Sequence, residues 1–475
     1  MKPALDNATV LVVGAGIMGS GIAQVAAQAG HSVLLHDSQE GAAQSAIDGL
    51  ATTFDQLVAR GKLAQAEADQ TLRRITAVAR LDQAGVAGLV VEAIAEDLES
   101  KRGLFRLLET HVGTDCVLAT NTSSLSVTAI ANGLAHPERL VGLHFFNPAP
   151  LMKLVEIVSG LHTDCRVAEA VHDLAGSWGK VAVHARSTPG FIVNRIARPF
   201  YAESLALLQD QAATPAQLDA CLRSAGFRMG PCELMDLIGQ DTNYAVTCSV
   251  FAANYYDKRF APSQVQKALV EGGLLGRKTN RGFYRYPRED QAADNAVAPP
   301  ASLPATKVLQ IHGWSATTRR IAELLDRHDA KYETVNDSDW CGLQADAAQL
   351  RETDGRTASQ LGRDVAVFDR ALTDAPGAAL AWSHSSRASQ SWIDESRQWL
   401  RALGFQAVRV DDTPGLVVAR TVAMLINEAA DAVQQGVCSQ GDADRAAYLA
   451  EVATRLPLRR IAHSKYVHGV TSRAA

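Results

Sequence analysis

The chain has 475 residues and a formal net charge of −5, with 47% apolar residues, 20% charged residues and seven cysteines. Its length is more than one hydrophobic core fills, so we expect two or three domains of an ordinary globular protein. The weakly acidic balance gives no electrostatic basis for binding nucleic acid or an anionic membrane. The scattered cysteines, none spaced as C-x-x-C, argue against a disulfide framework or a zinc site and for a reducing compartment. The first apolar run, residues 10–13, is too short for a secretion signal or a membrane span, so a cytoplasmic protein without a metal is predicted.

A dinucleotide-binding pattern opens the chain. Residues 9–13 form an unbroken apolar run, typical of a strand buried on both faces, and residues 20–30 have a helical composition. Between them lies a G-x-G-x-x-G sequence, which consists of Gly14, Ala15, Gly16, Ile17, Met18 and Gly19. Glycines at this spacing permit a tight turn, close approach of the backbone to a pyrophosphate and close packing of helix on strand. The alternative is a glycine turn before a core helix that binds no ligand.

The next strand indicates which dinucleotide this loop would bind. Residues 31–36 form a second predicted strand, which ends at Asp37, eighteen residues after Gly19. A carboxylate at this point can accept hydrogen bonds from a ribose 2′-hydroxyl and would repel a 2′-phosphate. We therefore expect NAD rather than NADP as the cofactor.

The alternation of strands and helices continues. Residues 89–93, 116–120 and 140–146 are predicted strands, and residues 100–111 a predicted helix. This order is typical of a doubly wound, Rossmann-type parallel sheet, in which ligands lie beyond the carboxyl ends of the strands. Two polar features fall at such ends, the loop at residues 121–124 and His144.

A polar, helical stretch from about residue 40 to residue 80 contains a basic turn. Arg60 and Lys62 lie at a predicted junction between two helices. This turn is either a solvated surface or a contact for a phosphate of the substrate. Arg60 and Lys62 are the best substrate-binding candidates in the sequence.

His144 and Glu156 are the candidate catalytic pair. Oxidation of a hydroxyl group needs a base that takes the O–H proton while a hydride leaves the carbon, and the ordinary pKa of histidine is near neutrality. A neighbouring carboxylate would fix the tautomer of the imidazole and stabilise its protonated form. Residues 151–158 are rich in apolar and β-branched side chains and could return beside the His144 strand, with Glu156 opposite His144. The alternative is a histidine packed in the core without a chemical role.

A Thr-Pro-Gly turn at residues 188–190 marks the start of a second domain. It precedes a predicted long helix whose first turn carries Asn194. The Asn194 amide could bond to the oxygen of a substrate or to the histidine, or be an ordinary polar residue at a helix start. Mostly helical segments follow to about residue 286, in an all-helical domain of a kind that commonly forms dimers.

Six motifs resemble the 3-hydroxyacyl-CoA dehydrogenase family in order and spacing, over about residues 8–286. They are the glycine loop with Asp37, residues 91–96, residues 121–124, residues 142–148, residues 152–156 and residues 188–195. The resemblance implies a Rossmann domain, an all-α C-terminal domain, and oxidation of L-3-hydroxyacyl-CoA to 3-oxoacyl-CoA with NAD.

The resemblance also implies a role for each candidate residue. His144 would be the base, Glu156 its partner, and Ser123 and Asn194 the hydrogen-bonding groups around the reacting oxygen. Along the NAD site would lie Glu96, Lys101, Ser123 and, near the nicotinamide, Asn147.

Further features concern the substrate. The long two-unit architecture, with residues 236–241 and 247–251, resembles members that act on 3-hydroxyadipyl-CoA in bacterial phenylacetate breakdown. Close relatives act on 3-hydroxybutyryl-CoA in short-chain fatty-acid metabolism. Two alternatives to a dehydrogenase of CoA esters are a dehydrogenase of a free 3-hydroxy acid and a non-catalytic NAD-binding protein.

The chain repeats itself with an offset of 225 residues, since residues 179–193 align with residues 404–418 and share Thr-Pro-Gly. Residues 202–204 likewise align with residues 427–429. In the second copy Asn194 is replaced by Ala419, and the helix break at residues 226–231 has no counterpart. Residues 451–475 are instead a basic stretch unlike the family's continuation, for which we hypothesise a truncation or an altered reading frame. The repeat therefore predicts a second, incomplete helical unit and one active site.

We predict five segments: a Rossmann NAD-binding domain at 1–186, a helical substrate and dimerisation domain at 187–286, a Pro- and Ala-rich linker at 287–305, a small degenerate α/β unit at 306–411 and the incomplete helical repeat at 412–475. In the small unit, strands are expected at 307–311, 364–368 and 378–382, and helices at 316–327 and 390–403. Its loop at residues 311–315 lacks G-x-G-x-x-G, so no NAD is expected there. We expect a homodimer.

Overall fold

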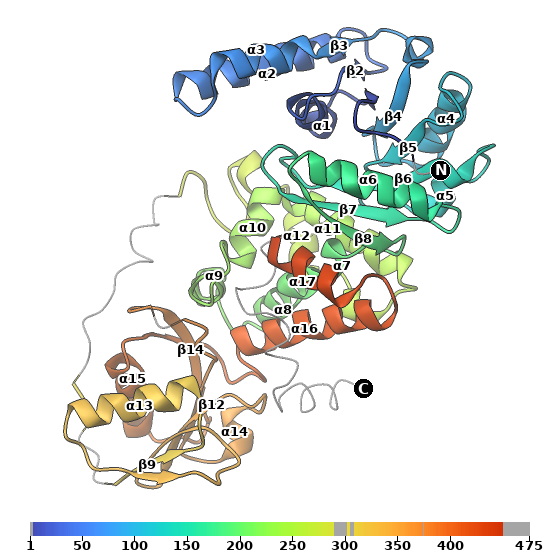
Figure 1. The fold of residues 1–475 in the computed structure, drawn as a ribbon. Coiled ribbons are helices and arrows are strands. Elements are labelled where there is room, and N and C mark those ends of the chain that lie inside the picture. The colour runs from blue at the N-terminus through green and yellow to red at the C-terminus, as the bar shows by residue number, and fades with distance from the viewer. Residues whose placement is uncertain (1–2, 289–301, 305–307, 374, 450–475) are drawn as a thin grey trace. The chain divides into compact units, whose positions relative to one another are not determined.

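The computed structural model describes residues 3–288, 302–304, 308–373 and 375–449 (Figure 1). The chain divides into two compact units, each considered by itself. One unit comprises Met1–Arg195 with Ala430–Ala450, and the other comprises Ile196–Ala429. Most of the predicted linker and all of the hypothesised atypical tail at 451–475 lie outside the described residues.

The first unit is built on an eight-stranded sheet with the order β3-β2-β1-β4-β5-β6-β7-β8. All neighbouring strands are parallel except β6 and β7, which are antiparallel. The predicted doubly wound Rossmann sheet is confirmed, and its order reverses between β1 and β4, where such sheets bind ligands. The strands are β1 (Thr9–Val13), β2 (Val33–His36), β3 (Ile75–Ala77), β4 (Ala87–Glu92), β5 (Val117–Thr120), β6 (Leu140–Phe145), β7 (Leu154–Ser159) and β8 (Val181–Arg186).

Helices of this unit cover the sheet, so the central strands are apolar on both sides. Four of the five residues of β1 and all six of β6 are buried. The basic turn at Arg60 and Lys62 joins α2 to α3, as predicted. The helices are α1 (Ile17–Gln28), α2 (Ala42–Ala59), α3 (Gln65–Arg73), α4 (Leu98–Glu109), α5 (Val127–Ile130), α6 (Cys165–Ser177), α7 (Val193–Ile196) and α17 (Gln440–Leu449), with 3₁₀ turns η1 (Leu81–Ala84) and η2 (Pro137–Arg139).

The prediction of one long helix after the Thr-Pro-Gly turn is wrong. The short α7 ends at Ile196, and a separate helix, α8, begins at Arg198. Pro199 lies in the first turn of α8, where its missing N–H is tolerated but would interrupt a continuous helix.

The second unit combines helices with a second sheet. Its helical part contains α8 (Arg198–Gln209), α9 (Pro215–Ser224), α10 (Pro231–Ile238), α11 (Gln240–Ala253) and α12 (Gln264–Glu271), with η3 (Lys258–Phe260) and η4 (Arg277–Thr279). The later helices are α13 (Ala316–Arg327), α14 (Ala358–Leu361), α15 (Gln390–Ala402) and α16 (Val418–Gln434), the last of which crosses the boundary between the units. The predicted helices at 316–327 and 390–403 are confirmed as α13 and α15.

The second sheet has seven strands in the order β10-β9-β11-β12-β13-β14-β15 and is mixed. Three of the strands were predicted, whereas the other four carry Gly, Gln or charged residues that give no apolar run. The strands are β9 (Leu309–His312), β10 (Glu333–Val335), β11 (Gly342–Ala345), β12 (Ala348–Glu352), β13 (Val365–Phe368), β14 (Ala379–His384) and β15 (Gln406–Arg409).

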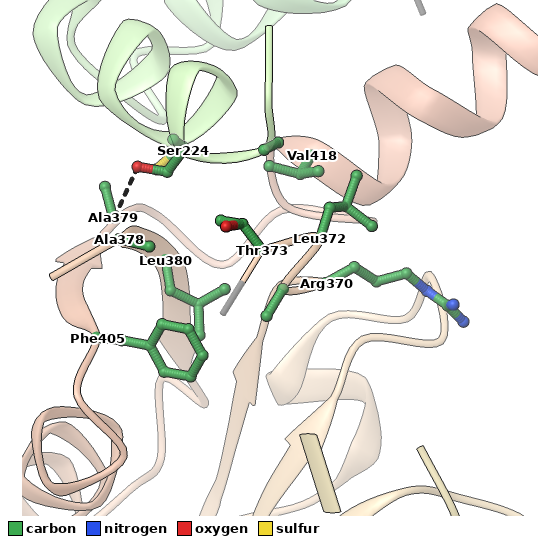
Figure 2. Close-up of a pocket in the computed structure, with 12 residues that line it drawn as sticks. Ser224, Arg370, Leu372, Thr373, Ala378, Ala379, Leu380, Phe405 and Val418 are labelled. Atoms are coloured by element: carbon green, nitrogen blue, oxygen red, sulfur yellow. Dashed lines mark hydrogen bonds between the residues drawn. The ribbon is translucent and has the colours of Figure 1, made fainter. Parts of the chain in front are cut away.

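The α9 helix packs against β14 in the core of the second unit. Ser224 Oγ accepts a hydrogen bond from the Ala379 N–H at 2.8 Å beside a narrow pocket (Figure 2). The pocket has a cavity volume of about 10 Å³, far below that of ordinary ligand sites. We therefore interpret it as a packing gap at this junction.

Among the described ranges, no helix has both the length and the apolar character needed to cross a bilayer. The same ranges hold no group of three or more His, Cys, Asp or Glu side chains suited to a metal ion.

Candidate active site

The loop between β1 and α1 has the geometry that its glycines predict. Gly14 has a φ of 104°, and a Cβ at Gly19 would lie 1.7 Å from the Gly14 carbonyl oxygen. A Cβ at Gly16, the N-cap of α1, would meet open space. The loop is therefore packed tightly on the Gly19 side and open on the Gly16 side, where the N-terminus of α1 can receive an anion. Ile17 is 77% exposed beside this opening, and Met18 is half-buried.

Asp37 follows β2 directly and is fixed to the glycine loop. Its Oδ2 accepts a hydrogen bond from the Ala15 N–H at 2.7 Å, and its Oδ1 accepts one from the Gln39 N–H at 2.9 Å. The carboxylate thus lies where the ribose of a dinucleotide bound at α1 would reach it.

Replacement of Asp37 by alanine is expected to weaken NAD binding by about 10- to 100-fold, because a charged hydrogen-bond acceptor is lost. NADP binding should weaken less, since the repulsion of its 2′-phosphate disappears with the carboxylate. Fluorescence titration of both dinucleotides checks this, with the nearby exposed Glu40→Ala as the control. Equal losses for NAD and NADP would contradict the role given to Asp37.

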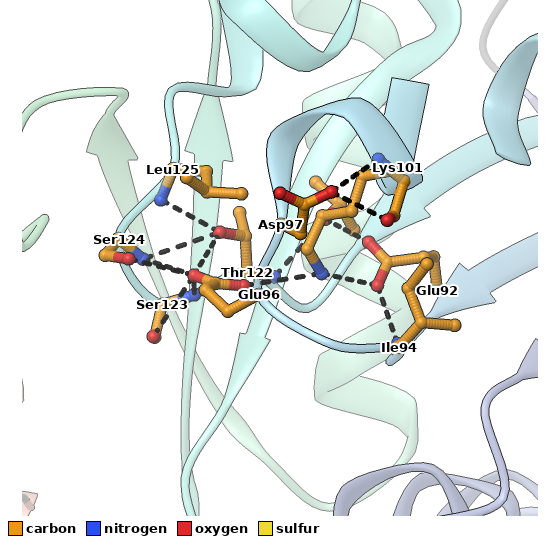
Figure 3. Close-up of polar contacts among 11 residues, drawn as sticks. Glu92, Ile94, Glu96, Asp97, Lys101, Thr122, Ser123, Ser124 and Leu125 are labelled. Atoms are coloured by element: carbon orange, nitrogen blue, oxygen red, sulfur yellow. Dashed lines mark hydrogen bonds and ion pairs between the residues drawn. The ribbon is translucent and has the colours of Figure 1, made fainter. Parts of the chain in front are cut away.

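The loop after β5 is gathered around the carboxylate of Glu96 (Figure 3). Glu96 Oε1 accepts hydrogen bonds from Thr122 Oγ1 at 2.7 Å and from the N–H groups of Ser123 and Ser124 at 2.9 Å each. The hydroxyl of Ser123, at 3.3 Å, donates the weakest bond of the group. Burial alone would raise the pKa of Glu96, but these hydrogen bonds and the charge of Lys101 lower it. An ionised Glu96 therefore holds Ser123 at the carboxyl end of β5.

Lys101 is buried behind this loop. Its side chain is 1% exposed, and its Nζ lies 2.5 Å from Glu92 Oε1 and 3.4 Å from Glu96 Oε2. Glu92 also accepts hydrogen bonds from the Ile94 N–H at 2.8 Å and from Thr120 Oγ1 at 2.6 Å. The ion pair of Lys101 with Glu92 offsets the cost of burying these two charges, and Glu96, whose side chain is 35% exposed, adds a second carboxylate beside the ammonium group. Lys101 thereby supports Glu96, and its ammonium group does not lie on the open surface of the site.

His144 and Glu156 face each other on β6 and β7. The antiparallel register pairs His144 with Glu156, and His144 Nδ1 lies 2.6 Å from Glu156 Oε2. His144 is 5% exposed and Glu156 is fully buried. The expected return of the chain beside the His144 strand is confirmed. A proton on Nδ1 that bonds to Glu156 leaves Nε2 as the nitrogen that can act as a base.

The second oxygen of Glu156 holds the Thr-Pro-Gly turn. Glu156 Oε1 accepts hydrogen bonds from the N–H groups of Ile192 at 3.0 Å and Val193 at 2.9 Å. Phe191, in this turn, has a φ of 47° that a non-glycine residue rarely adopts, and its ring lies 5.7 Å from that of His144. Asn194 comes next in α7. The Glu156 carboxylate therefore fixes the position of both His144 and the backbone that carries the Asn194 amide.

Known protein families match both the dinucleotide-binding domain and the helical segment that follows it. A family model described as "3-hydroxyacyl-CoA dehydrogenase, NAD binding domain" matches residues 9–188, and one described as "3-hydroxyacyl-CoA dehydrogenase, C-terminal domain" matches residues 190–286. The chain belongs to the 3-hydroxyacyl-CoA dehydrogenase family. It is accordingly an NAD-dependent oxidoreductase. A third model, "3-hydroxybutyryl-CoA dehydrogenase reduced Rossmann-fold domain", matches residues 350–414, within the small α/β unit.

Individual relatives extend this similarity. The 3-hydroxyadipyl-CoA dehydrogenase of Escherichia coli (strain K12) is 44% identical over 443 residues, which are 92% of this chain and 87% of that protein. The 3-hydroxybutyryl-CoA dehydrogenase of Clostridioides difficile is 37% identical over 276 residues, 58% of this chain and 98% of that protein. A solved structure of 3-hydroxybutyryl-CoA dehydrogenase from Escherichia coli K12 has a TM-score of 0.86 at 39% identity, and the match covers 99% of this chain and 95% of that one.

The residues of this dehydrogenase fit NAD. The open side of the loop at Gly16 gives a pyrophosphate access to the first turn of α1, and Asp37 is fixed beside it. Parallel strands bring the ends of β1, β4, β5 and β6 to one edge of the sheet. The cofactor cradle, Ser123 and His144 therefore share that edge.

The remaining predicted site residues lie in different settings. Asn147 is exposed just after β6, and Asn194 is half-buried in α7. Arg60 and Lys62 are exposed in the turn between α2 and α3, and these two helices lie away from β6 and β7 in Figure 1. The structure therefore does not bring these two basic residues together with the catalytic pair.

Two further residues organise the site and had no predicted role. Asn121 Oδ1 accepts a hydrogen bond from the Phe145 N–H at 2.8 Å, which ties the loop after β5 to the residue after His144. Glu92 is the buried partner of Lys101. The sequence signal for Glu92 was present, because a carboxylate at the end of an apolar strand must find a partner.

The second repeat keeps the turn and loses the histidine. Gly415 and Leu416 have φ values of 72° and 51°, close to the 76° and 47° of Gly190 and Phe191. The offset of the repeat places Asp369 at the position of His144 and Ala381 at that of Glu156, and the Asp369 N–H donates to the Ala381 oxygen at 2.9 Å.

Asp369 takes over only one task of Glu156. Its carboxylate accepts hydrogen bonds from the N–H groups of Val417, Val418 and Ala419 at 2.9, 2.6 and 2.9 Å. In the second repeat, the carboxylate that holds the turn is thus on the opposite strand. It belongs to Asp369, at the position that corresponds to His144. Within the described part of the second repeat, the His–carboxylate pair has no copy.

The loop after the β9 strand of the second sheet packs against Trp340. The loop after β9 contains Gly313, with a φ of 64°, and a Cβ there would lie 2.6 Å from the Trp340 oxygen. The Trp340 ring stacks on His312 with centroids 4.1 Å apart, and Arg351 lies over its ring. Protein atoms therefore pack closely against this loop at Gly313.

Proposed function

We propose that this dehydrogenase oxidises (3S)-3-hydroxyacyl-CoA to 3-oxoacyl-CoA at the edge that carries His144, with 3-hydroxyadipyl-CoA as its substrate in phenylacetate breakdown. The observation that carries the proposal is the buried His144–Glu156 pair at 2.6 Å on the same sheet edge as the dinucleotide loop. A base beside a hydride acceptor is what oxidation of a secondary alcohol requires.

Each residue has a separate task in this mechanism. Glu156 fixes the tautomer of His144 and stabilises its protonated form, so that Nε2 takes the proton of the 3-hydroxyl group. NAD supplies the acceptor for the hydride that leaves C3. Ser123 and Asn194 hydrogen-bond to the reacting oxygen and stabilise it as it becomes a carbonyl. Arg60 and Lys62 remain candidates for the CoA phosphates, on the basis of their charge alone.

The choice of 3-hydroxyadipyl-CoA is supported by the length of the shared architecture. The relative with that substrate name matches 92% of this chain, whereas the 3-hydroxybutyryl-CoA dehydrogenase of Clostridioides difficile matches 58%. The second candidate is 3-hydroxybutyryl-CoA, because the solved structure with a TM-score of 0.86 carries that substrate in its name.

Two assays test the proposal. Loss of NADH is followed first with acetoacetyl-CoA and then with free acetoacetate, and turnover of the CoA ester alone is expected. Turnover of the free acid would favour a dehydrogenase of free 3-hydroxy acids, and NAD binding without any turnover would favour a non-catalytic protein. Comparison of kcat/KM for 3-hydroxyadipyl-CoA and 3-hydroxybutyryl-CoA then decides the substrate.

We also propose a cytoplasmic homodimer, on the basis of the cysteine pattern and the helical second domain. Light scattering coupled to size-exclusion chromatography measures the assembly. A mass of one chain, 50.7 kDa, would contradict the dimer.

A further inference from the structure

The segment that joins β8 to α7 is held near both of its ends by the second repeat. The N–H of Arg186, the last residue of β8, donates to the Val437 oxygen at 2.8 Å. Arg195 Nη1 donates to Gln435 Oε1 at 3.0 Å. Gln435 and Val437 belong to one turn, between α16 and α17, and α17 lies beside β8 (Figure 1). This single turn is therefore hydrogen-bonded to the chain at both residue 186 and residue 195.

The turn has a defined shape. Gly436 has a φ of 66°, its N–H donates to the Val433 oxygen at 3.0 Å, and the Val437 N–H donates to the Ala432 oxygen at 2.9 Å, which ends α16 in a glycine cap. Val437 is 2% exposed. These bonds and the buried Val437 side chain fix the shape of the turn. Its hydrogen bonds can therefore hold Arg186 and Arg195 in place.

The segment between residues 186 and 195 carries the groups that build the active site. Ile192 and Val193 donate their N–H groups to Glu156, and Asn194 follows them. Arg195, next along the chain, is 4% exposed, and its own N–H donates to the Gly190 oxygen at 3.1 Å. A shift of the Arg195 side chain would therefore move the backbone of Asn194 and strain the bonds to Glu156.

Cys438 is the last residue of the same turn and is partly buried. Burial raises the pKa of the Cys438 thiol, and with the negative charges of Asp442 and Glu156, which act in the same direction, and the opposing charge of Arg195, the pKa is about 11. Glu156 and Arg195 are thus among the charges that act on this turn.

We propose that the turn of Gln435, Gly436, Val437 and Cys438 is a positioning element of the active site, with Gln435 acting through Arg195 on Asn194 and Glu156. The inference rests on the dehydrogenase activity proposed above. In this inference the second repeat, which lacks the His–carboxylate pair, contributes to the reaction. Its turn helps to position the active site of the first repeat.

The test compares three variants in steady-state kinetics. Gln435→Met keeps the length of the side chain and removes the oxygen that accepts from Arg195, so kcat should fall about three- to tenfold, as for loss of one hydrogen bond to a charged group. KM for NAD should stay at the wild-type value, because the cofactor loop is not involved. Gln435→Glu keeps an acceptor for Arg195 and should restore kcat. Gln434→Met, at the neighbouring exposed glutamine, is the matched control and should behave as the wild type.

A double-mutant cycle separates positioning from simple stability. In an Asn194→Ala background, Gln435→Met should lower kcat by a smaller factor than in the wild-type background, because only its effect through Glu156 remains. Wild-type kcat in Gln435→Met, or an equal loss in both backgrounds, would overturn the inference. If the wild type turns over no substrate, the proposed function fails by itself. Hydrogen exchange of the Ile192 and Val193 amides then decides, since it should be faster in Gln435→Met than in Gln434→Met; equal rates would overturn the inference.

Discussion

Replacement of His144 by glutamine is expected to lower kcat for reduction of acetoacetyl-CoA by about 10²–10⁴-fold, the range usual for loss of a general base. Glutamine fills a similar volume and can still donate a hydrogen bond to Glu156, but its amide cannot take up a proton. The Kd for NAD should stay near that of the wild type, because the glycine loop and Asp37 make no hydrogen bond to this side chain. Stopped-flow measurement of NADH oxidation and fluorescence titration of NAD check the two quantities.

A surface histidine provides the control for this variant. His172 is half-exposed on α6, and His172→Gln should leave kcat and NAD affinity unchanged. If His144→Gln retained a kcat within threefold of the wild type, His144 would not be the base. A parallel loss of NAD binding would indicate instead that the fold around the cofactor had changed.

Replacement of Glu156 by glutamine is expected to lower kcat by about 10³–10⁴-fold, as when the carboxylate that orients a catalytic histidine becomes an amide. The amide NH₂ would face His144 Nδ1, which must then accept a hydrogen bond and leave its proton on Nε2. The imidazole would hold the wrong tautomer for taking a proton from the substrate. The oxygen of the glutamine can still accept from Ile192 and Val193, so thermal unfolding should shift by only a few degrees.

Asp369 offers a matched control for this prediction. It anchors the equivalent turn of the second repeat without a histidine, so Asp369→Asn should lower the unfolding temperature and leave kcat near the wild-type value. Equal kcat losses in Glu156→Gln and Asp369→Asn would show that Glu156 matters only as a turn anchor. Activity of Glu156→Gln close to the wild type would contradict the role of the carboxylate in orienting His144.

The sequence was sufficient for the features that depend on local pattern. Strand β1, the glycine loop and α1 follow from an apolar run, three spaced glycines and a helical stretch, all within about twenty residues. Asp37 is in the same class, because its place at the end of β2 follows from its distance along the chain. The four additional strands of the second sheet, such as β10 and β11, have no such pattern, since their residues are held by neighbouring strands rather than by their own apolar character.

By itself, the sequence determined that the chain has one dinucleotide loop, one His–carboxylate candidate pair and a repeat offset by 225 residues. Only the tertiary structure decided how these parts meet. The register of β6 and β7 places Glu156 opposite His144. A turn 240 residues from Arg195 in the sequence accepts a hydrogen bond from Arg195, in the segment that carries Asn194. The physical reason is that hydrogen bonds across a sheet or between distant turns depend on which backbones lie side by side, and spacing along one chain does not fix that.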